Sequence, residues 1–174
     1  MAKTGSKSRQ RLTALKRIVR EVDSAPDLDS ALRLLVRRTR EVMGADVCTV
    51  YLTDEAEHRH VVAATDSLSS RIVGNLQFGF GKGLIGRVAE SRQPVNLDRV
   101  PQGLDQDVLL QQAGAGPYQG FLGVPIIHRA MVQGVLLIRQ CEARRFDDAD
   151  EAFLSTFAAQ LGGAIAYART SGEW

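Results

Sequence analysis

The spacing of apolar residues predicts two amphipathic helices near the start of the chain. Apolar residues recur every three or four positions over residues 12–22, with basic residues between them, and this is the period of one helix face. Pro26 interrupts the pattern, and a second stripe of the same period covers residues 28–43. Asp27 is placed to cap the second helix at its start, and Gly44 is placed to end it. Both helices need a surface against which to bury their apolar stripes.

Runs of β-branched and aromatic residues after position 44 predict a sheet that contains two hairpins. A polar turn at residues 54–57 joins the strands of the first hairpin, and residues 128–131 join those of the second. Hairpins pair antiparallel strands, so the sheet is expected to be antiparallel. Pro125 predicts an edge or a bulge in its strand. About six strands are expected, at residues 46–52, 60–65, 76–78, 94–97, 120–127 and 132–139.

The first predicted strand has two different faces. Side chains alternate along a strand, so Cys48, Val50 and Leu52 share one face, while Thr49 and Tyr51 lie on the other. The first face is apolar, and the second mixes hydroxyl groups with apolar atoms. We therefore expect helices to cover the first face and a partly polar cavity to lie against the second.

The chain closes with a predicted helix that starts after Asp147. The first turn is rich in acidic residues, which suits the helix dipole, and Asp147 is a good cap. Gly162 and Gly163 interrupt the apolar stripe of this helix, at a cost of about 1 kcal/mol each relative to alanine. The simplest explanation is a second helix that approaches closely at the two glycines.

Residues 79–86 are rich in glycine and lead into a short predicted helix at 84–91. The glycines from position 81 have the spacing of a dinucleotide-binding fingerprint, but that motif needs a strand-helix-strand unit of about 30 residues. The span from Gly81 to Asp98 is 18 residues. A phosphate-binding loop of the Walker type is also excluded, because Lys82 is followed by glycine instead of serine or threonine. The stretch therefore predicts a backbone hinge that covers a pocket.

Composition indicates one soluble globular domain of 174 residues, with 44% hydrophobic and 24% charged residues. No apolar run reaches the roughly 20 residues of a membrane span and no secretory signal is present, so we expect a cytoplasmic protein without membrane contact.

Residues 1–20 carry seven basic residues and no acidic one. Without interleaved aromatics this segment is not expected to bind nucleic acid, and residues 1–9 are expected to be a disordered tail. Residues 98–117 predict a long loop.

Cysteine and histidine positions suggest neither a metal site nor a disulfide framework. Cys48 lies in an apolar strand and is expected to be buried, and Cys141 lies in a polar segment and is expected to be partly exposed. His58 and His60 are two residues apart, with no third ligand nearby, so surface positions are expected. We therefore expect no metal, no cofactor and no catalytic residue.

The predicted order of elements places the chain in the α+β class. It has an antiparallel sheet, with the N- and C-terminal helices on one face and loops and a short helix over the other. This arrangement resembles the GAF family of small-molecule sensors, which is related to PAS domains. The resemblance extends over residues 12–169, and residues 10–170 are expected to form a single domain. Its most specific segments are residues 45–52, 81–86, 123–126, 134–136 and 146–147.

A closer resemblance is to the N-terminal GAF domains of phosphoenolpyruvate-protein phosphotransferases of the nitrogen phosphotransferase system. It rests on residues 15–22, 47–52, 121–128 and 146–154. It implies a regulatory domain without catalytic activity, because the phosphohistidine and barrel domains of that family are not in this chain. It also implies a nitrogen-status metabolite, glutamine or 2-oxoglutarate, and signalling through the terminal helices to the phosphotransferase domains. The residues that the resemblance places against the ligand are Thr49, Tyr51, Thr65, Phe80, Leu84, Phe121 and Pro125.

Other functions are compatible with the same fold. The domain can serve as an interaction module without a ligand, and a homodimer through the terminal helices is expected in either case. Free methionine-sulfoxide reductases also have GAF folds, but their chemistry needs two neighbouring cysteines, which Cys48 and Cys141 do not suggest. A cyclic-nucleotide sensor fits the fold alone, and no residue argues for it.

Overall fold

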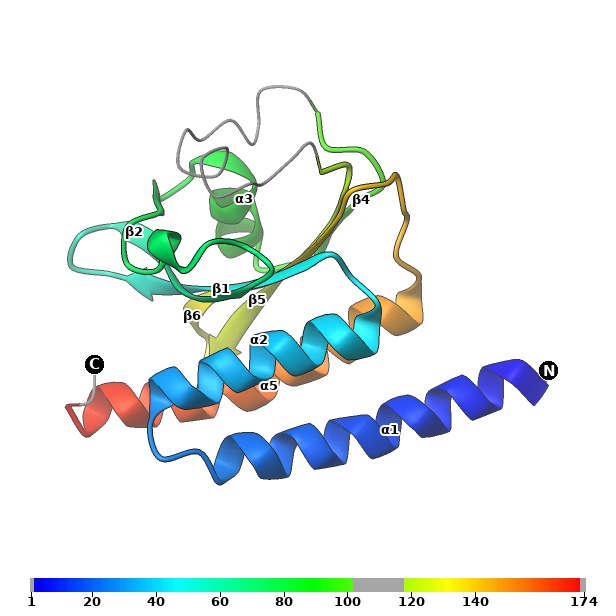
Figure 1. Cartoon of the computed structure of the whole chain (residues 1–174). Coiled ribbons are helices and arrows are strands. Elements are labelled where there is room, and N and C mark those ends of the chain that lie inside the picture. Colours follow the sequence, from blue (N-terminus) through cyan, green and yellow to red (C-terminus); the bar gives the residue numbers. More distant parts are fainter. Residues whose placement is uncertain (1, 102–117, 173–174) are drawn as a thin grey trace.

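A computed structural model describes residues 2–101 and 118–172, with side chains from residue 9 onward (Figure 1). The long helices, the strands and the short helix α3 follow one another in the order that the sequence predicts. The elements are α1 (Ala2–Asp23), α2 (Leu28–Met43), β1 (Val47–Asp54), β2 (Arg59–Asp66), the 3₁₀ helix η1 (Ser70–Ile72), β3 (Gln77–Gly79), α3 (Gly83–Ser91), β4 (Val95–Leu97), β5 (Gly120–His128), β6 (Met131–Gln140) and α5 (Asp148–Thr170). Apart from residues 98–101, the loop predicted at 98–117 lies outside the described residues.

The strands form one antiparallel sheet in the order β3-β2-β1-β6-β5-β4. The two hairpins join through β1 and β6, where Leu52 pairs with Gly134. A Cβ at Gly134 would lie 2.1 Å from the carbonyl oxygen of Tyr51, so only glycine fits there. Pro125 lies beyond the residues of β5 that pair with β4, just before a register shift at Ile126. The predicted edge or bulge position of this proline is confirmed.

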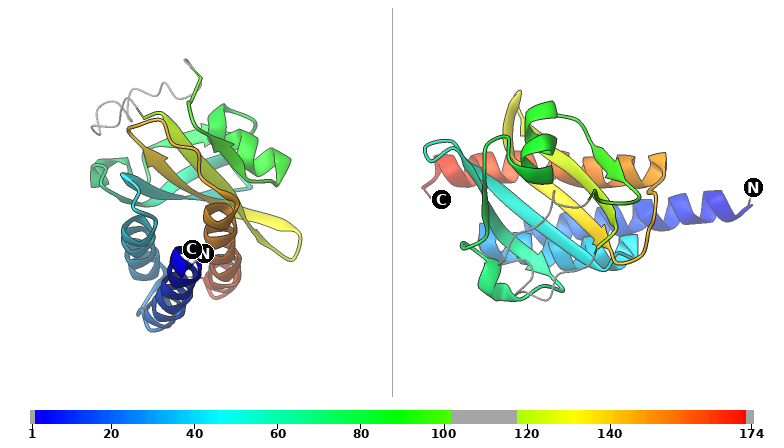
Figure 2. Two further views of the ribbon diagram at one scale, coloured as in Figure 1. Left: turned by 90° about the vertical axis from the view of Figure 1, so that its right-hand side faces the viewer. Right: turned by 90° about the horizontal axis from the view of Figure 1, so that it is seen from above.

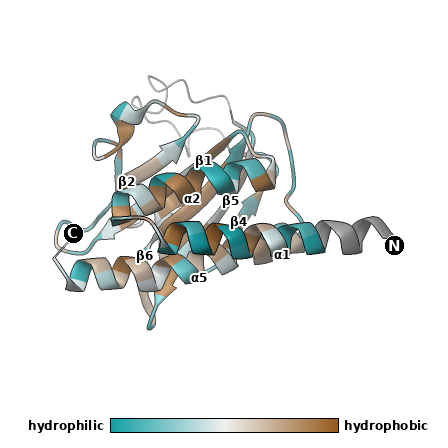
Figure 3. Ribbon diagram, turned by 60° about the horizontal axis from the view of Figure 1, so that its bottom comes forward, coloured by the Kyte–Doolittle hydropathy of each residue, from teal (hydrophilic) through white to brown (hydrophobic). Residues whose placement is uncertain are grey.

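Helices α2 and α5 lie side by side against one face of the sheet, here called the bundle face (Figures 1 and 2). Helix α1 lies on the side of these two helices that is turned away from the sheet. Cys48, Val50 and Leu52 of β1 belong to the core on the bundle face, as the alternation predicts. The helices contribute Leu32 and Phe157, both completely buried, while the outward side of α2 carries hydrophilic residues (Figure 3).

The other face of the sheet, here called the α3 face, is covered by α3 and η1 (Figure 1). A second apolar cluster lies there and includes Tyr51, Leu84 and Phe121. The glycine stretch turns the chain into α3, with positive φ at Gly81 and Gly83. A Cβ at Gly86 would lie 2.7 Å from the backbone of Gly81. The glycines are therefore needed because the turn packs directly on the helix that follows it.

The ends of the helices follow the predicted caps. The Asp27 side chain accepts a hydrogen bond from the backbone N–H of Ser30 at 2.7 Å, and Gly44 ends α2 at a φ of 62°. Asp147 and Asp150 form a reciprocal capping box at the start of α5. Helix α1 begins at Ala2, within the segment whose composition predicts disorder. Lysine and arginine propagate a helix well once the turns that follow have formed, although Gly5, Ser6 and Ser8 disfavour it.

The prediction that a helix approaches Gly162 is wrong. A Cβ at Gly162 would lie 2.7 Å from the carbonyl oxygen of Ile127, so the close neighbour is the end of strand β5. A Cβ at Gly163 would meet only the ring of His128, at 3.9 Å. Gly162 alone is thus required for packing, and it lets α5 rest directly on the sheet.

Candidate functional site on the sheet

Two of the predicted ligand residues form a hydroxyl pair on the α3 face. Thr49 and Thr65 face each other across β1 and β2, and their hydroxyl oxygens are 2.9 Å apart. Thr65 also lies 3.4 Å from the carbonyl oxygen of Cys48, to which its hydroxyl can donate. Thr49 is only 2% exposed. Because buried hydroxyls need hydrogen-bond partners, the two threonines satisfy each other.

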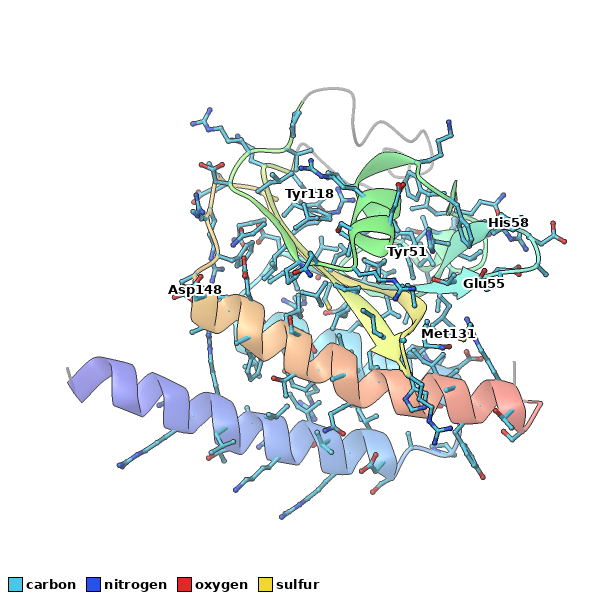
Figure 4. All side chains as sticks on the ribbon, turned by 180° about the vertical axis from the view of Figure 1, so that it is seen from behind. Tyr51, Glu55, His58, Tyr118, Met131 and Asp148 are labelled. Atoms are coloured by element: carbon cyan, nitrogen blue, oxygen red, sulfur yellow. The ribbon has the colours of Figure 1, made fainter. Side chains whose placement is uncertain are left out.

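Three further predicted residues, Tyr51, Leu84 and Phe121, are brought together in the cluster beneath α3. Tyr51 is almost fully buried, and its ring lies 6.0 Å from that of Phe78. In Figure 4 it is seen between the sheet and α3. Together with the threonines these residues place hydroxyl groups beside an apolar wall, an arrangement that suits a small ligand with both polar and apolar parts.

The remaining two predicted residues lie apart from that group. Phe80 is 38% exposed and packs on His60, with 4.9 Å between the ring centroids. Pro125 is half-buried and pairs with Val135 further along the sheet. That the seven residues contact a ligand remains a prediction.

Arg139 is a residue of this face that sequence reasoning missed. It pairs with Val47 on one side and with Phe121 on the other, is only 2% exposed, and its guanidinium carbon lies 5.5 Å from the centre of the Phe121 ring. Burial lowers the pKa of Arg139, and the nearby Tyr51 acts in the opposite direction. Strand alternation could have predicted this position, because it places Arg139 on the same face as Val135 and Leu137.

A separate cavity of about 510 Å³ lies at the end of the sheet where the β1–β2 and β5–β6 turns meet α3. Figure 4 shows Glu55 and Met131 at this end. We call this cavity the hairpin cleft. Its lining residues are Thr53, Glu55, His60, Phe80, Gly81, Gly86, Ala89, Glu90, Arg92, Met131 and Val132.

The prediction that His58 and His60 share a surface position is wrong for His60. His60 is 3% exposed, and its Nδ1 lies 3.0 Å from the hydroxyl oxygen of Thr53. Its pKa is lowered because burial disfavours the charged ring, although Glu55 acts in the opposite direction. His58 lies in the turn with a φ of 50°, so the two rings do not belong to one strand face. No group of side chains suited to a metal ion is found in the described parts of the chain.

The cysteines do not form a redox pair in this fold. Cys48 is completely buried on the bundle face, and burial raises the pKa of its thiol. Cys141 is exposed just after β6, with its backbone N–H 2.7 Å from a carboxylate oxygen of Asp46. A thiol acts as a nucleophile when it is deprotonated, so the environment of Cys48 works against the reductase chemistry.

The family model of the GAF domain matches residues 27–165, which is most of the chain. The chain therefore belongs to the GAF family. None of the helices within the described ranges is both long and apolar enough to cross a membrane.

Three similar proteins belong to phosphoenolpyruvate phosphotransferases or to the phosphotransferase system. The GAF domain of a phosphoenolpyruvate-protein phosphotransferase from Coxiella burnetii is 39% identical, with a TM-score of 0.88, over 94% of this chain and 97% of that domain. The corresponding Acinetobacter domain is 33% identical, with a TM-score of 0.84, over 95% and 98%. A protein of the phosphoenolpyruvate-dependent phosphotransferase system of Escherichia coli is 34% identical over 88% of this chain. The chain spans about a fifth of the length of that relative.

Proposed function

We propose that this chain is the regulatory GAF domain of a cytoplasmic phosphoenolpyruvate-protein phosphotransferase. It binds a nitrogen-status metabolite, glutamine or 2-oxoglutarate, on the α3 face, and it transmits binding through its terminal helices to the phosphotransferase domains. The domain itself carries out no catalysis. The similarity to GAF domains of such phosphotransferases supports the proposed parent protein. The buried polar groups of the α3 face support the proposed metabolite binding.

The observation that carries the binding proposal is a positive charge held inside the domain on the α3 face. The Arg139 guanidinium is almost completely buried beside Phe121, and Thr49 and Thr65 supply hydroxyl groups on the same face. Both proposed metabolites carry a carboxylate. Guanidinium and hydroxyl groups are the partners that a carboxylate prefers, so this set of residues suits an anionic head group.

Polar contacts connect the ligand face to the helices. Arg40 of α2 forms an ion pair with Asp66, the residue after Thr65. Arg169 of α5 donates hydrogen bonds to the carbonyl oxygen of Thr53 and to the side chain of Gln133, at 3.2 Å in the second case. A shift of β1 or β2 on ligand binding would therefore be passed to α2 and α5.

Thermal-shift screening of the domain against amino acids and keto acids tests the proposal. Glutamine or 2-oxoglutarate should raise the unfolding temperature in a concentration-dependent way, because a ligand that binds only the folded state stabilises it. A screen in which neither metabolite changes the unfolding temperature at millimolar concentration would refute metabolite binding.

An interaction module without a ligand is the alternative, and exposed apolar residues on the helices favour it. Leu12 of α1 is 52% exposed and Tyr167 of α5 is 73% exposed. Light scattering separates the two functions. A stable dimer that responds to no metabolite supports the interaction module, and a domain that binds a metabolite in its monomeric form argues against it.

A further inference from the structure

The hairpin cleft lies at one end of the α3 face and differs from the region around Thr49 and Arg139 in its charged groups. Glu55 belongs to the β1–β2 turn, whereas Glu90 and Arg92 lie at the end of α3. Their side chains form no ion pair or hydrogen bond with any residue that the structure describes. Groups of both signs thus border one cavity without neutralising each other.

A buried polar residue, His60, also borders the hairpin cleft. His60 is 97% covered, and its Nδ1 is engaged by the hydroxyl of Thr53. Its Nε2 has no hydrogen-bond partner among the described residues. A neutral imidazole presents one donor and one acceptor, so Nε2 offers a hydrogen bond to a molecule in the cleft. Burial lowers the pKa of His60, which favours the neutral ring, while Glu55 acts in the opposite direction.

The remaining wall of the hairpin cleft is apolar and partly open. Phe80 and Met131 are 38% and 56% exposed, and they are among the few large apolar side chains of the described chain with so much exposed surface. Gly81 and Gly86 also line the cleft, so part of this side consists of backbone atoms. Exposed apolar surface next to a concave polar site is typical of a binding surface.

We propose that the hairpin cleft binds a free α-amino acid with an apolar side chain. The carboxylates of Glu55 and Glu90 receive the ammonium group, Arg92 receives the carboxylate, and Phe80, Met131 and Val132 contact the side chain. His60 Nε2 supplies a further hydrogen bond. A zwitterion uses the charges of both signs, which an amine or an acid alone does not. Apart from Phe80, the cleft shares no lining residue with the set proposed for the metabolite, which is centred on Thr49, Thr65 and Arg139.

Three isosteric probes test the charge requirement by titration calorimetry on the whole chain. L-Leucine carries both charged groups, isoamylamine lacks the carboxylate, and 4-methylpentanoate lacks the amine. L-Leucine should bind at least about tenfold more tightly than either analogue, because each analogue leaves a charged group of the cleft without its partner. Equal binding of isoamylamine, or no binding of L-leucine at millimolar concentration, overturns the proposal.

Substitutions at exposed positions locate the site. Glu90→Gln and Arg92→Asn should each weaken L-leucine binding about tenfold, and asparagine tolerates the positive φ of 56° at position 92. Arg87→Gln is the control, because Arg87 is exposed on the same helix and does not line the cleft. Unchanged binding in Glu90→Gln and Arg92→Asn, with melting temperatures equal to that of the wild type, overturns the proposal. Binding of glutamine or 2-oxoglutarate, measured in the same variants, reports on the α3 face separately.

Discussion

The two faces of the sheet are buried to a similar extent, but they bury different chemistry. On β1, Cys48, Val50 and Leu52 of the bundle face are at most 1% exposed. Thr49, Tyr51 and Thr53 of the α3 face are at most 3% exposed. The bundle face needs only apolar volume, because two helices cover it along its length. The α3 face keeps hydroxyl groups and a guanidinium inside the protein, at a cost that a purely structural core would avoid.

The largest expected effect is a cavity on the bundle face. Phe157→Ala should lower the free energy of unfolding by about 3–5 kcal/mol, because the completely buried ring packs against Phe153 and the sheet. Urea denaturation measures the change. Tyr167→Ala in the same helix is the control and should change stability by less than about 0.5 kcal/mol, since Tyr167 is 73% exposed. A small effect of Phe157→Ala would show that the bundle face is not the main core.

The next effect concerns the ion pair between Arg11 of α1 and Asp150 of α5, whose side chains are 11% and 5% exposed. Burial raises the pKa of Asp150, but hydrogen bonds from Arg11 and the Asp147 backbone outweigh this, and the net pKa is lowered. Asp150→Asn should cost about 1.5–3 kcal/mol at neutral pH, because Arg11 loses its charged partner.

The pH dependence of stability checks the role of Asp150. A carboxyl whose pKa is lower in the folded state stabilises the protein above its unfolded pKa of about 3.9, and this contribution is lost as the pH falls through the folded value. Wild-type stability should therefore fall more steeply below about pH 4 than that of Asp150→Asn. Parallel pH profiles for the two proteins would contradict the assignment.

Two adjacent glycines test how closely α5 rests on the sheet. Gly162→Ala should destabilise the domain by about 1–3 kcal/mol, because its Cβ would meet the Ile127 carbonyl oxygen at 2.7 Å. Gly163→Ala has no such neighbour and should stabilise the domain by up to about 1 kcal/mol. Thermal unfolding of both variants measures the difference, and equal effects would disprove the close approach at Gly162.

Exchanging polarity between the faces gives the most specific effects, and Thr49→Val is the mildest of these substitutions. Val50→Thr places a hydroxyl among apolar atoms on the bundle face and should cost about 1–3 kcal/mol. Thr49→Val should cost about 1 kcal/mol or less, because Thr65 keeps the Cys48 carbonyl oxygen as an acceptor. Thr49→Val should nevertheless weaken the thermal shift caused by the metabolite. If the two substitutions cost the same and neither affects the ligand response, the faces do not differ as described.

Periodicity and caps were sufficient to predict most of the fold. Local patterns specify the features that depend on residues close together in the chain. These features are the hairpins, the assignment of Cys48 and Thr49 to opposite faces, and the caps at Asp27 and Asp147. The neighbour of Gly162 could not be predicted in the same way. The sequence shows that a small residue is needed there, but not which distant element approaches it.

The candidate sites were predictable to different degrees. Five of the seven predicted ligand residues lie together on the α3 face, and Arg139 could have been added by strand alternation. The hairpin cleft could not be predicted, because three segments far apart in the sequence border it. The burial of His60 was also missed, since its position depends on Phe80, which covers its ring from twenty residues further along the chain.

Titration calorimetry of the wild-type domain and of Arg139→Met with glutamine and 2-oxoglutarate tests the ligand role of the α3 face most directly. At least one metabolite should bind the wild type, and Arg139→Met should weaken that binding about tenfold or more, because the carboxylate loses its charged partner. Glu90→Gln, in the hairpin cleft, should leave this binding unchanged. Absence of binding to the wild type, or equal affinities of the wild type and Arg139→Met, would contradict a ligand site on the α3 face.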